Sequence, residues 1–551
     1  MLAIFLLLTS LFTPIQTQAD ETFRYRIKPI PTNDRTNLEI SLQFNAANEV
    51  PVKLPVGCYS LPDIYRSVKT FEGEKGTIVT KGKDETERLV KPNSNGVINI
   101  KYTLSFDPER MLDIAFAPST GADYFHIGTC QWMLQIGELD KERPFVFEMI
   151  DAPKDWELYS SLGANPAYVK TISSYNKLTS SAIGGGNKNG VHRFSVKEKP
   201  VAAFVHGGFK VSKEEIFQVV ERIVTLQREW MNDYEQPFYT VAVRPRNGII
   251  AGTAPANYMV AFIKPEATKE EFNILLAHEM FHHWLPGRIE IKPEKGYRSF
   301  IHSWFHEGFN EYFARRILLE ADLLTPERFA ELINGDIINI ANNPFRNAAY
   351  EDLIDAAKKG RFDSAAQKIA YYRGVLIAVN WEAELQRKNK TGLKTIIRNL
   401  NEFAAKYNGE ITGQQFFEFM KKQGIDAKKN FEEYSMQGLS IPVYPNALGK
   451  NFVLRKKSVP HFDPGFSVID SFNEKKITGV VKDGAAYRAG LRNGMELVRI
   501  QNSNRFANAW REDRPMLVTI KENSSEKVFE FFPLGEPLDL LLFEPVKNRK
   551  K

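Results

Sequence analysis

Two histidines placed four residues apart constrain this chain more than any other feature. His278 and His282 lie in the segment 272–284, which contains neither glycine nor proline and is predicted to be helical. On a helix, residues i and i+4 share one face, so both imidazoles can reach a single metal ion. Glu279 directly follows the first histidine and can hold a water molecule beside that ion. The pattern therefore predicts a metal site whose catalytic base is Glu279.

A second helical pattern, over 301–321, supplies the other candidates for the site. Catalytic zinc takes three protein ligands and leaves one position open, and Glu307 is the predicted third ligand. Glu311 lies one turn further along the same face, where it can accept a hydrogen bond from a ligand histidine. His302 and His306, for which packing or surface roles are otherwise expected, are rival third ligands.

Hydrolytic chemistry at such a site also needs a hydrogen-bond donor for the tetrahedral oxyanion. The best candidates are Tyr371 and Tyr372, in the helical segment 368–374. Paired tyrosines in a helix more often belong to a hydrophobic core. The residues alone therefore leave the identity of this donor open.

The chain has 551 residues, which is enough for several domains, and its residue pattern changes twice. Residues 20–195 are predicted to form a β-sandwich-like domain, residues 196–440 an α/β and helical domain, and residues 441–545 a domain with strands again. The fold class expected from this order is a multidomain α+β protein.

Individual elements follow from the periodicity of the apolar residues. Strands are predicted at 23–27, 38–44, 97–102, 238–243, 258–263, 477–481 and 494–500. Helices are predicted at 212–230, 269–284, 301–321 and 366–385. The glycine-rich stretch 180–190 is predicted to be a loop at a domain boundary.

The N-terminus and the composition bear on location and partners. An apolar run at 2–12, followed by small residues, predicts a signal peptide over 1–19 and a mature start at Asp20. The protein is therefore expected to be exported, periplasmic or secreted, with no integral membrane segment after processing. The formal charge of +6 is spread along the chain without a basic stripe, which argues against nucleic acid. The two cysteines, Cys58 and Cys130, are either a disulfide or two buried thiols.

The motifs HEMFHHW, GRIEIKP and WFHEGFNEYFA together resemble those of the gluzincin metallopeptidases, and most closely the glycyl aminopeptidase family. This resemblance implies a thermolysin-like catalytic domain between an N-terminal β domain and a C-terminal PDZ domain, with one zinc ion per chain. It implies peptide or protein substrates and a C-terminal peptide as ligand of the PDZ-like domain. Related gluzincins stabilise the oxyanion with the tyrosine of a Tyr-x-Lys-Gly pattern. Tyr371, in the sequence Tyr-Tyr-Arg-Gly, matches that tyrosine, and Tyr372 is the lesser candidate.

One departure from the pattern concerns the end of the peptide on which the protein acts. Aminopeptidases of this broad group carry a Gly-Gly-x-Glu type motif whose glutamate binds the free amine of the substrate. The corresponding stretch 249–257 contains no acid. An aminopeptidase-like activity, an endopeptidase of the same fold and a non-catalytic scaffold that binds peptides through its PDZ-like domain are therefore three hypotheses. The presence of Glu279, which is not a ligand, favours an enzyme over a scaffold.

Overall fold

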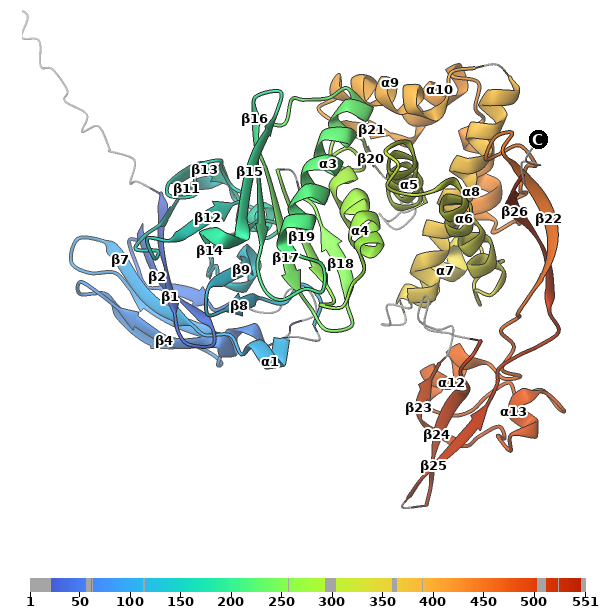
Figure 1. Ribbon diagram of the computed structural model, residues 1–551. Coiled ribbons are helices and arrows are strands. Elements are labelled where there is room, and N and C mark those ends of the chain that lie inside the picture. Colours follow the sequence, from blue (N-terminus) through green and yellow to red (C-terminus); the bar gives the residue numbers. More distant parts are fainter. Residues whose placement is uncertain are drawn as a thin grey trace, which may run out of the picture.

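Four regions follow one another along the computed structural model of the chain. A β-rich N-terminal region leads to a sheet with helices beside it, then to a helical region and a small C-terminal unit (Figure 1). The structure describes residues 21–55, 61, 63–111, 114–255, 257–292, 304–358, 364–388, 390–502, 512–523 and 525–546, so the predicted signal peptide lies outside it. The multidomain mixed α and β architecture is confirmed. Over the described residues, no helix has the length and apolar character needed to span a bilayer.

The N-terminal region contains three sheets that share one hydrophobic core. β1 (Phe23–Pro31), β2 (Thr36–Asn45) and β7 (Val97–Leu104) confirm the three strands predicted there. They belong to a sheet of order β13-β11-β1-β2-β7-β4, which also contains β4 (Val68–Gly73), β11 (Arg143–Met149) and β13 (Val169–Ser173). The second sheet has β10 (Gln135–Ile136), β3 (Val50–Lys53), β6 (Glu87–Lys91) and β5 (Ile78–Lys81), and the third has β12 (Trp156–Ser160), β14 (Ala182–Asn187), β9 (Tyr124–Gly128) and β8 (Ser119–Gly121).

The prediction of a loop over 180–190 is wrong. β14 (Ala182–Asn187) is a strand that pairs with both β9 and β12, and five of its six residues are buried. A Cβ atom at Gly184 would lie 2.7 Å from Cε1 of Tyr159, and one at Gly186 would lie 2.8 Å from the carbonyl oxygen of Asp123. The glycines in this strand therefore allow close packing. A glycine-rich strand of this kind has the same composition as a flexible loop.

The cysteine pairing can be followed at one of the two positions. Cys130 is buried and takes part in a disulfide. Cys58, the other cysteine of the chain, lies outside the described residues.

The central sheet has the order β15-β16-β17-β19-β18. Its strands are β15 (Val191–Val196), β16 (Lys199–Val205), β17 (Tyr239–Pro245), β19 (Tyr258–Ile263) and β18 (Ile250–Thr253). β16, β17 and β19 are parallel, whereas β18 runs antiparallel to β19 and forms an edge of the sheet. The helices α3 (Lys213–Met231) and α4 (Lys269–Phe281) pack on this sheet in one core, and each begins with a capping box, at Ser212 and Thr268 respectively.

Two predicted helices differ from their expected form at the point where they meet. α4 ends at Phe281, and the second histidine of the motif, His282, is its C-cap residue. The pattern at 301–321 was expected to be one α-helix, but it contains the π-helix η5 (Trp304–Phe309) followed by α5 (Asn310–Glu320), and 301–303 lie outside the described residues. Single π-turns within helices are frequent at functional sites, and this one carries Glu307.

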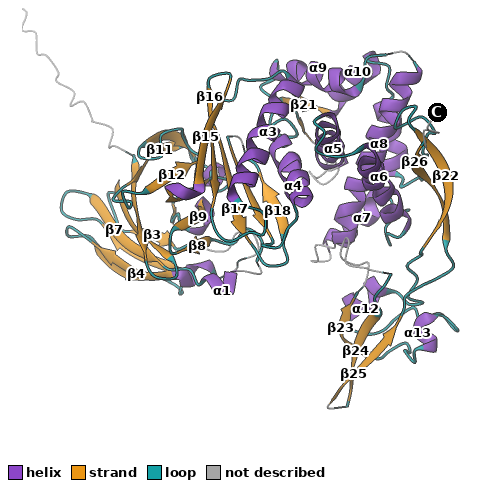
Figure 2. Ribbon diagram, viewed as in Figure 1, coloured by secondary structure: helices purple, strands orange, loops and turns teal. Residues whose placement is uncertain are grey.

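The helical region packs around α8 (Ser364–Arg387), which contains the predicted helix 366–385 (Figure 2). A Cβ atom at Gly374 would collide with the carbonyl oxygen of Trp304 and lie 2.8 Å from Cα of Gly308, so η5 and α8 touch backbone to backbone. The other elements here are α6 (Pro326–Ala341), α7 (Tyr350–Lys358), α9 (Leu393–Ala405), α10 (Gly413–Lys422), α11 (Ala427–Asn430), β20 (Glu290–Lys292) and β21 (Glu410–Thr412).

A two-stranded ribbon of β22 (Phe452–Val459) and β26 (Leu538–Pro545) connects the C-terminal unit to the helical region (Figure 1). The side chain of Asn334 on α6 holds this ribbon by two hydrogen bonds of 2.8 Å to the backbone of Phe543. The unit contains α12 (Val468–Glu474), α13 (Ala485–Arg488), β23 (Glu496–Gln501), β24 (Met516–Glu522) and β25 (Ser525–Phe531). The strand predicted at 477–481 is wrong, because Gly479 has a φ of 67° there and only a single bridge joins Lys476 to Glu496.

The contact between η5 and α8 gives a prediction for stability. Gly374→Ala should destabilise the protein by about 2–3 kcal/mol, because the added methyl group overpacks a helix crossing with no room to relax. Gly335→Ala is the matched control, because a Cβ atom at this position in α6 meets nothing within 4 Å. That change should be neutral or stabilise by about 0.5–1 kcal/mol. Thermal unfolding of both variants checks this, and an equal response would contradict the packing argument.

Candidate metal centre

Two histidines and a glutamate at the C-terminal end of helix α4 lie close together. The ligand-type atoms of His278, Glu279 and His282 all lie within 4.8 Å of one another. The two imidazole rings are nearly perpendicular, at 88°, with centroids 4.9 Å apart. Because His282 is the C-cap of α4, the helix ends directly after it has supplied both rings. The structure thus brings the histidines together as the spacing predicted.

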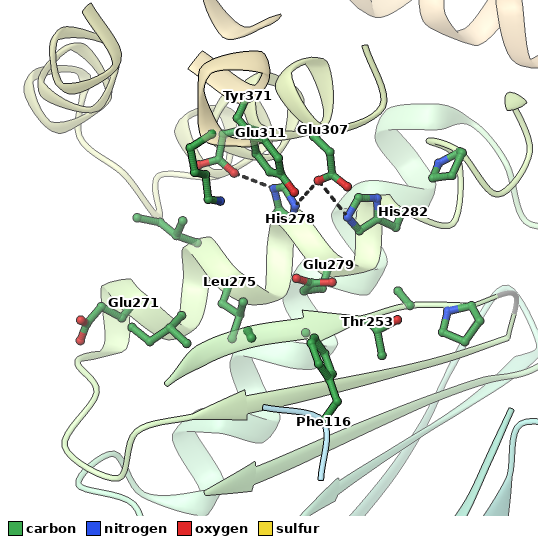
Figure 3. A pocket seen from close by; sticks show the side chains of 18 residues that line it. Phe116, Thr253, Glu271, Leu275, His278, Glu279, His282, Glu307, Glu311 and Tyr371 are labelled. Atoms are coloured by element: carbon green, nitrogen blue, oxygen red, sulfur yellow. Dashed lines mark hydrogen bonds and ion pairs between the residues drawn. The ribbon is translucent and has the colours of Figure 1, made fainter. Parts of the chain in front are cut away.

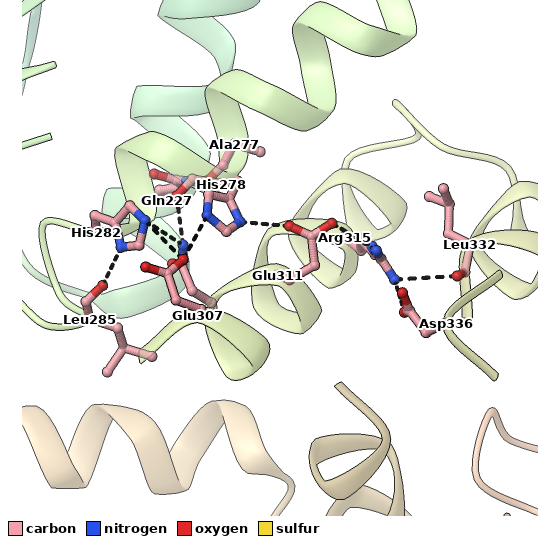
Figure 4. A network of polar contacts seen from close by, with 11 residues as sticks. Gln227, Ala277, His278, His282, Leu285, Glu307, Glu311, Arg315, Leu332 and Asp336 are labelled. Atoms are coloured by element: carbon pink, nitrogen blue, oxygen red, sulfur yellow. Dashed lines mark hydrogen bonds and ion pairs between the residues drawn. The ribbon is translucent and has the colours of Figure 1, made fainter. Parts of the chain in front are cut away.

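Glu307 of η5 faces both histidines. Its Oε2 atom lies 3.3 Å from Nε2 of His278 and 3.6 Å from Nε2 of His282 (Figure 4). Burial alone raises the pKa of Glu307, but the two neighbouring histidines outweigh burial and hold that pKa well below its usual range. The carboxylate is therefore ionised and points at the two ring nitrogens.

The remaining ring nitrogens have partners that set the tautomers. Nδ1 of His282 donates to the carbonyl oxygen of Leu285 at 2.6 Å. Nδ1 of His278 donates to Oε2 of Glu311, also at 2.6 Å. A carbonyl and an ionised carboxylate accept only, so each Nδ1 carries a proton, and Nε2 is the nitrogen of each ring that faces Glu307 and would bind a metal ion.

This donor set fits a zinc ion. Within the described part of the chain, Oε2 of Glu307 is buried and has no hydrogen-bond donor, although it faces two nitrogens. A buried carboxylate oxygen without a donor is costly unless a cation completes it. Tetrahedral zinc with bonds of about 2.0–2.2 Å separates its ligand atoms by roughly 3.3–3.6 Å. The distances from Glu307 to the two histidines agree with that geometry.

A buried chain of charges supports the first histidine. Glu311 accepts from Nε and Nη2 of Arg315, at 3.1 and 2.7 Å, and Arg315 in turn binds Asp336 of α6 (Figure 4). Burial raises the pKa of Glu311, but Arg315 and His278 outweigh it and keep the pKa far below its usual range. Burial raises the pKa of Asp336 to about 6, although Arg315 acts against the shift. Removing one member of such a network leaves an uncompensated buried charge.

Glu279 lies between the histidines and the edge strand β18 (Figure 3). Burial raises the pKa of its carboxyl group, which favours a general base working near neutral pH. A Cβ atom at Gly252 would lie 2.5 Å from Cδ of Glu279. The glycine of β18 is therefore what allows this carboxylate to sit directly against the strand.

Tyr371 reaches the same site from α8. Its hydroxyl group hydrogen bonds to Glu307, and its ring lies nearly parallel to that of His278, with centroids 6.4 Å apart. Burial raises the pKa of the phenol strongly, so the hydroxyl group keeps its proton and can donate it in a hydrogen bond. Tyr372 does not line the cleft that holds the histidines, and it faces a separate cavity near Asp336. Of the two tyrosines, Tyr371 is the one that lies at the metal centre.

The other histidines of this stretch lie elsewhere. Nε2 of His306 accepts from the backbone nitrogen of Ile291 at 3.4 Å. Nδ1 of His283 lies 3.2 Å from Nε2 of Gln236. Neither belongs to the cluster, and His302 lies outside the described residues. The rival third ligand His306 therefore does not fit.

The site opens into a cleft of about 670 Å³ between α4, β18 and α8. Phe116, Gly252 and Lys368 are among the cleft residues that the sequence analysis did not single out. Gly252 carried a signal, since a glycine inside a strand pattern often marks a close approach. Lys368 lies one helical turn before Tyr371, which the sequence analysis had considered. Its Nζ atom lies 3.9 Å from the ring centroid of that tyrosine. Phe116 carried no such signal, because it lies in the N-terminal region, far from the other cleft residues in the sequence.

The comparison with a known family decides the class of the protein. The sequence model of the M61 glycyl aminopeptidase family matches residues 271–377, which include α4, η5, α5 and Tyr371. The chain is a peptidase, and over these residues it is similar to that family. The matched stretch covers the histidines, both glutamates that contact them and the edge of α8, and this agrees with a zinc metallopeptidase.

A solved structure extends the likeness in fold to most of the length of this peptidase. An aminopeptidase N family protein from Idiomarina loihiensis has a TM-score of 0.68 and 15% identity, covering 95% of this chain and 98% of that chain. At this identity the likeness concerns the fold alone. An M1 zinc metallopeptidase from Deinococcus radiodurans has a TM-score of 0.42 and 13% identity, covering 77% of this chain and 95% of that chain. No curated protein matches the sequence of this peptidase.

The charge chain behind His278 gives a prediction for metal affinity. Glu311→Gln should weaken zinc binding by the protein about 10–100-fold, because the neutral amide no longer balances the charge of Arg315 and is a weaker acceptor for the imidazole of His278. Glu331→Gln is the matched control, because that side chain is 61% exposed on the neighbouring helix. Competition with a chromogenic chelator measures the affinity. Equal zinc affinity in the two variants would remove Glu311 from the site.

The close contact of β18 with Glu279 gives a prediction for turnover. Gly252→Ala should leave bound zinc unchanged and lower kcat about 100-fold, because a displacement of about 1 Å at a catalytic group costs that much. Gly208→Ala, whose Cβ atom would meet nothing within 4 Å, should keep full activity. Zinc content and peptide hydrolysis are measured together. Unchanged kcat in the first variant would show that Glu279 tolerates movement.

Proposed function

We propose that the protein hydrolyses peptide bonds as a zinc-dependent peptidase, with Glu279 as the general base. The observation that supports this most directly is the position of Glu279, which lies against the edge strand on one side and within 4.8 Å of the ligand-type atoms of the two histidines on the other. A zinc ion held by His278, His282 and Glu307 would lower the pKa of a bound water molecule to about 7 and polarise the scissile carbonyl group.

The protein's own groups carry the remaining steps. Glu279 accepts the proton of the attacking water molecule and later delivers it to the leaving amine, a role that its raised pKa favours. The hydroxyl group of Tyr371 donates to the oxygen that becomes negatively charged. The free edge of β18 offers backbone groups that can pair with an extended peptide along the cleft.

Whether the enzyme removes residues from the N-terminus of a peptide or cleaves within it depends on a binding group for the free amine. Among the described residues of the cleft, Glu279, Glu307 and Glu311 serve the metal centre, and Glu271 is bound to Lys264 at 2.7 Å and caps α4. β18 contributes no acid, so a binding group for a free amine is not identified among them. The family match favours an aminopeptidase-like enzyme, and an endopeptidase of the same fold is the alternative.

One variant tests the proposed function. Glu279→Gln should retain one zinc ion per chain and lose peptide hydrolysis by at least about 100-fold, because the amide cannot accept the proton. The substrates are a peptide library with free and with acetylated N-termini, so that the products also separate aminopeptidase from endopeptidase action. If wild type and variant hydrolyse the library equally poorly, the proposal fails and a non-catalytic scaffold is favoured.

A further inference from the structure

An aromatic side chain from the N-terminal region reaches into the catalytic cleft. Phe116 lines the cleft together with α4 and β18, although it precedes them by more than a hundred positions in the sequence. Figure 3 shows it beneath the strands that hold Thr253, on the side of the cleft where Glu279 and Leu275 project from α4. The side chain is half-buried, so one part packs on the protein and another faces the cleft.

The backbone at this residue is strained. Phe116 has a φ of 60°, in the left-handed region that a bulky side chain rarely adopts. A glycine there would avoid the penalty, yet the chain places a large aromatic residue at the position. Strain of this kind persists only where surrounding contacts impose it, and it is concentrated at functional sites.

Hydrogen bonds from two buried side chains hold the strained segment that contains Phe116. Arg246, only 2% exposed, uses one guanidinium nitrogen to bind the carbonyl oxygen of Pro118, at 2.9 Å, and that of Ala117. Nε2 of Gln131 donates to the carbonyl oxygen of Phe116 at 2.8 Å. The ring itself packs edge-on against Phe262 of β19, with centroids 5.8 Å apart.

Burying a guanidinium group against neutral carbonyl oxygens is costly. The ring of Phe262, whose centroid lies 4.9 Å from Cζ of Arg246, offsets part of that cost. Two unfavourable features, the strained backbone and the buried cation, thus meet at one short segment. The strained φ belongs to Phe116 itself, and Arg246 binds the carbonyl oxygens of the two residues that follow it.

We propose that Phe116 forms the wall of a subsite that binds an apolar side chain of the substrate beside the scissile bond, and that Arg246 is its positioning residue. Leu275 and Ile250 supply further apolar surface around the same space. Glu279, which must lie near the attacked carbonyl group, stands at its edge (Figure 3). This inference rests on the proposed peptidase activity and adds a substrate class to it.

The experiment compares peptides that differ only in the residue beside the scissile bond, leucine or glycine. Phe116→Ala should lower kcat/KM for the leucine peptide at least about tenfold, mainly through KM, and leave the glycine peptide nearly unchanged. Phe116→Leu should restore part of the selectivity. Arg246→Met should reduce selectivity in the same direction while zinc content stays the same. Phe532→Ala, at a residue 51% exposed in the C-terminal part, is the control and should behave as wild type.

A stability measurement tests the strain independently of activity. Phe116→Gly should melt at a higher temperature than Phe116→Ala, the reverse of the usual order, because glycine adopts a positive φ freely. If wild type hydrolyses no peptide, the proposed function fails. If wild type hydrolyses both peptides but the Phe116 and Arg246 variants keep its leucine-to-glycine ratio, the subsite is refuted and the peptidase stands.

Discussion

The backbone contact between Gly308 and Gly374 decides how the metal centre is assembled. It brings η5 against α8 without intervening side chains, and so places Glu307 and Tyr371 within hydrogen-bonding distance of each other. The wider turn of the π-helix directs Glu307 at the two histidines of α4. A side chain at either glycine would separate the two helices and, with them, Glu307 from Tyr371.

Electrostatics around His278 extend well beyond the cleft. The chain from His278 through Glu311 and Arg315 to Asp336 joins α4, α5 and α6, and all of its members are largely buried. Each charge is acceptable only because its neighbour is present, so the network fixes three helices relative to the metal centre. α6 also carries Asn334, which holds the ribbon leading to the C-terminal unit.

The cleft is a composite of regions that are distant in the sequence. α4 and its C-cap supply Glu279 and two histidines, β18 supplies an edge of the sheet, α8 supplies Tyr371, and the N-terminal region supplies Phe116. Because Arg246 of the central sheet region binds the segment that carries Phe116, the N-terminal region is a structural part of the cleft. A catalytic segment alone would therefore have the metal ligands but an incomplete cleft wall.

The sequence by itself determined the chemistry that depends on local spacing. Helix geometry puts His278 and His282, four positions apart, on one face, and Glu279 is their neighbour in the sequence. Most strands and helices could likewise be predicted from the periodicity of their apolar residues. The loop predicted at 180–190 failed because glycines that allow close packing have the same composition as glycines in a loop.

Only the tertiary structure decided which distant groups meet. It placed Glu311 on His278, excluded His306, separated Tyr371 from Tyr372 and brought Phe116 to the cleft. These contacts depend on helix crossings and on pairing between regions, which residue spacing does not encode.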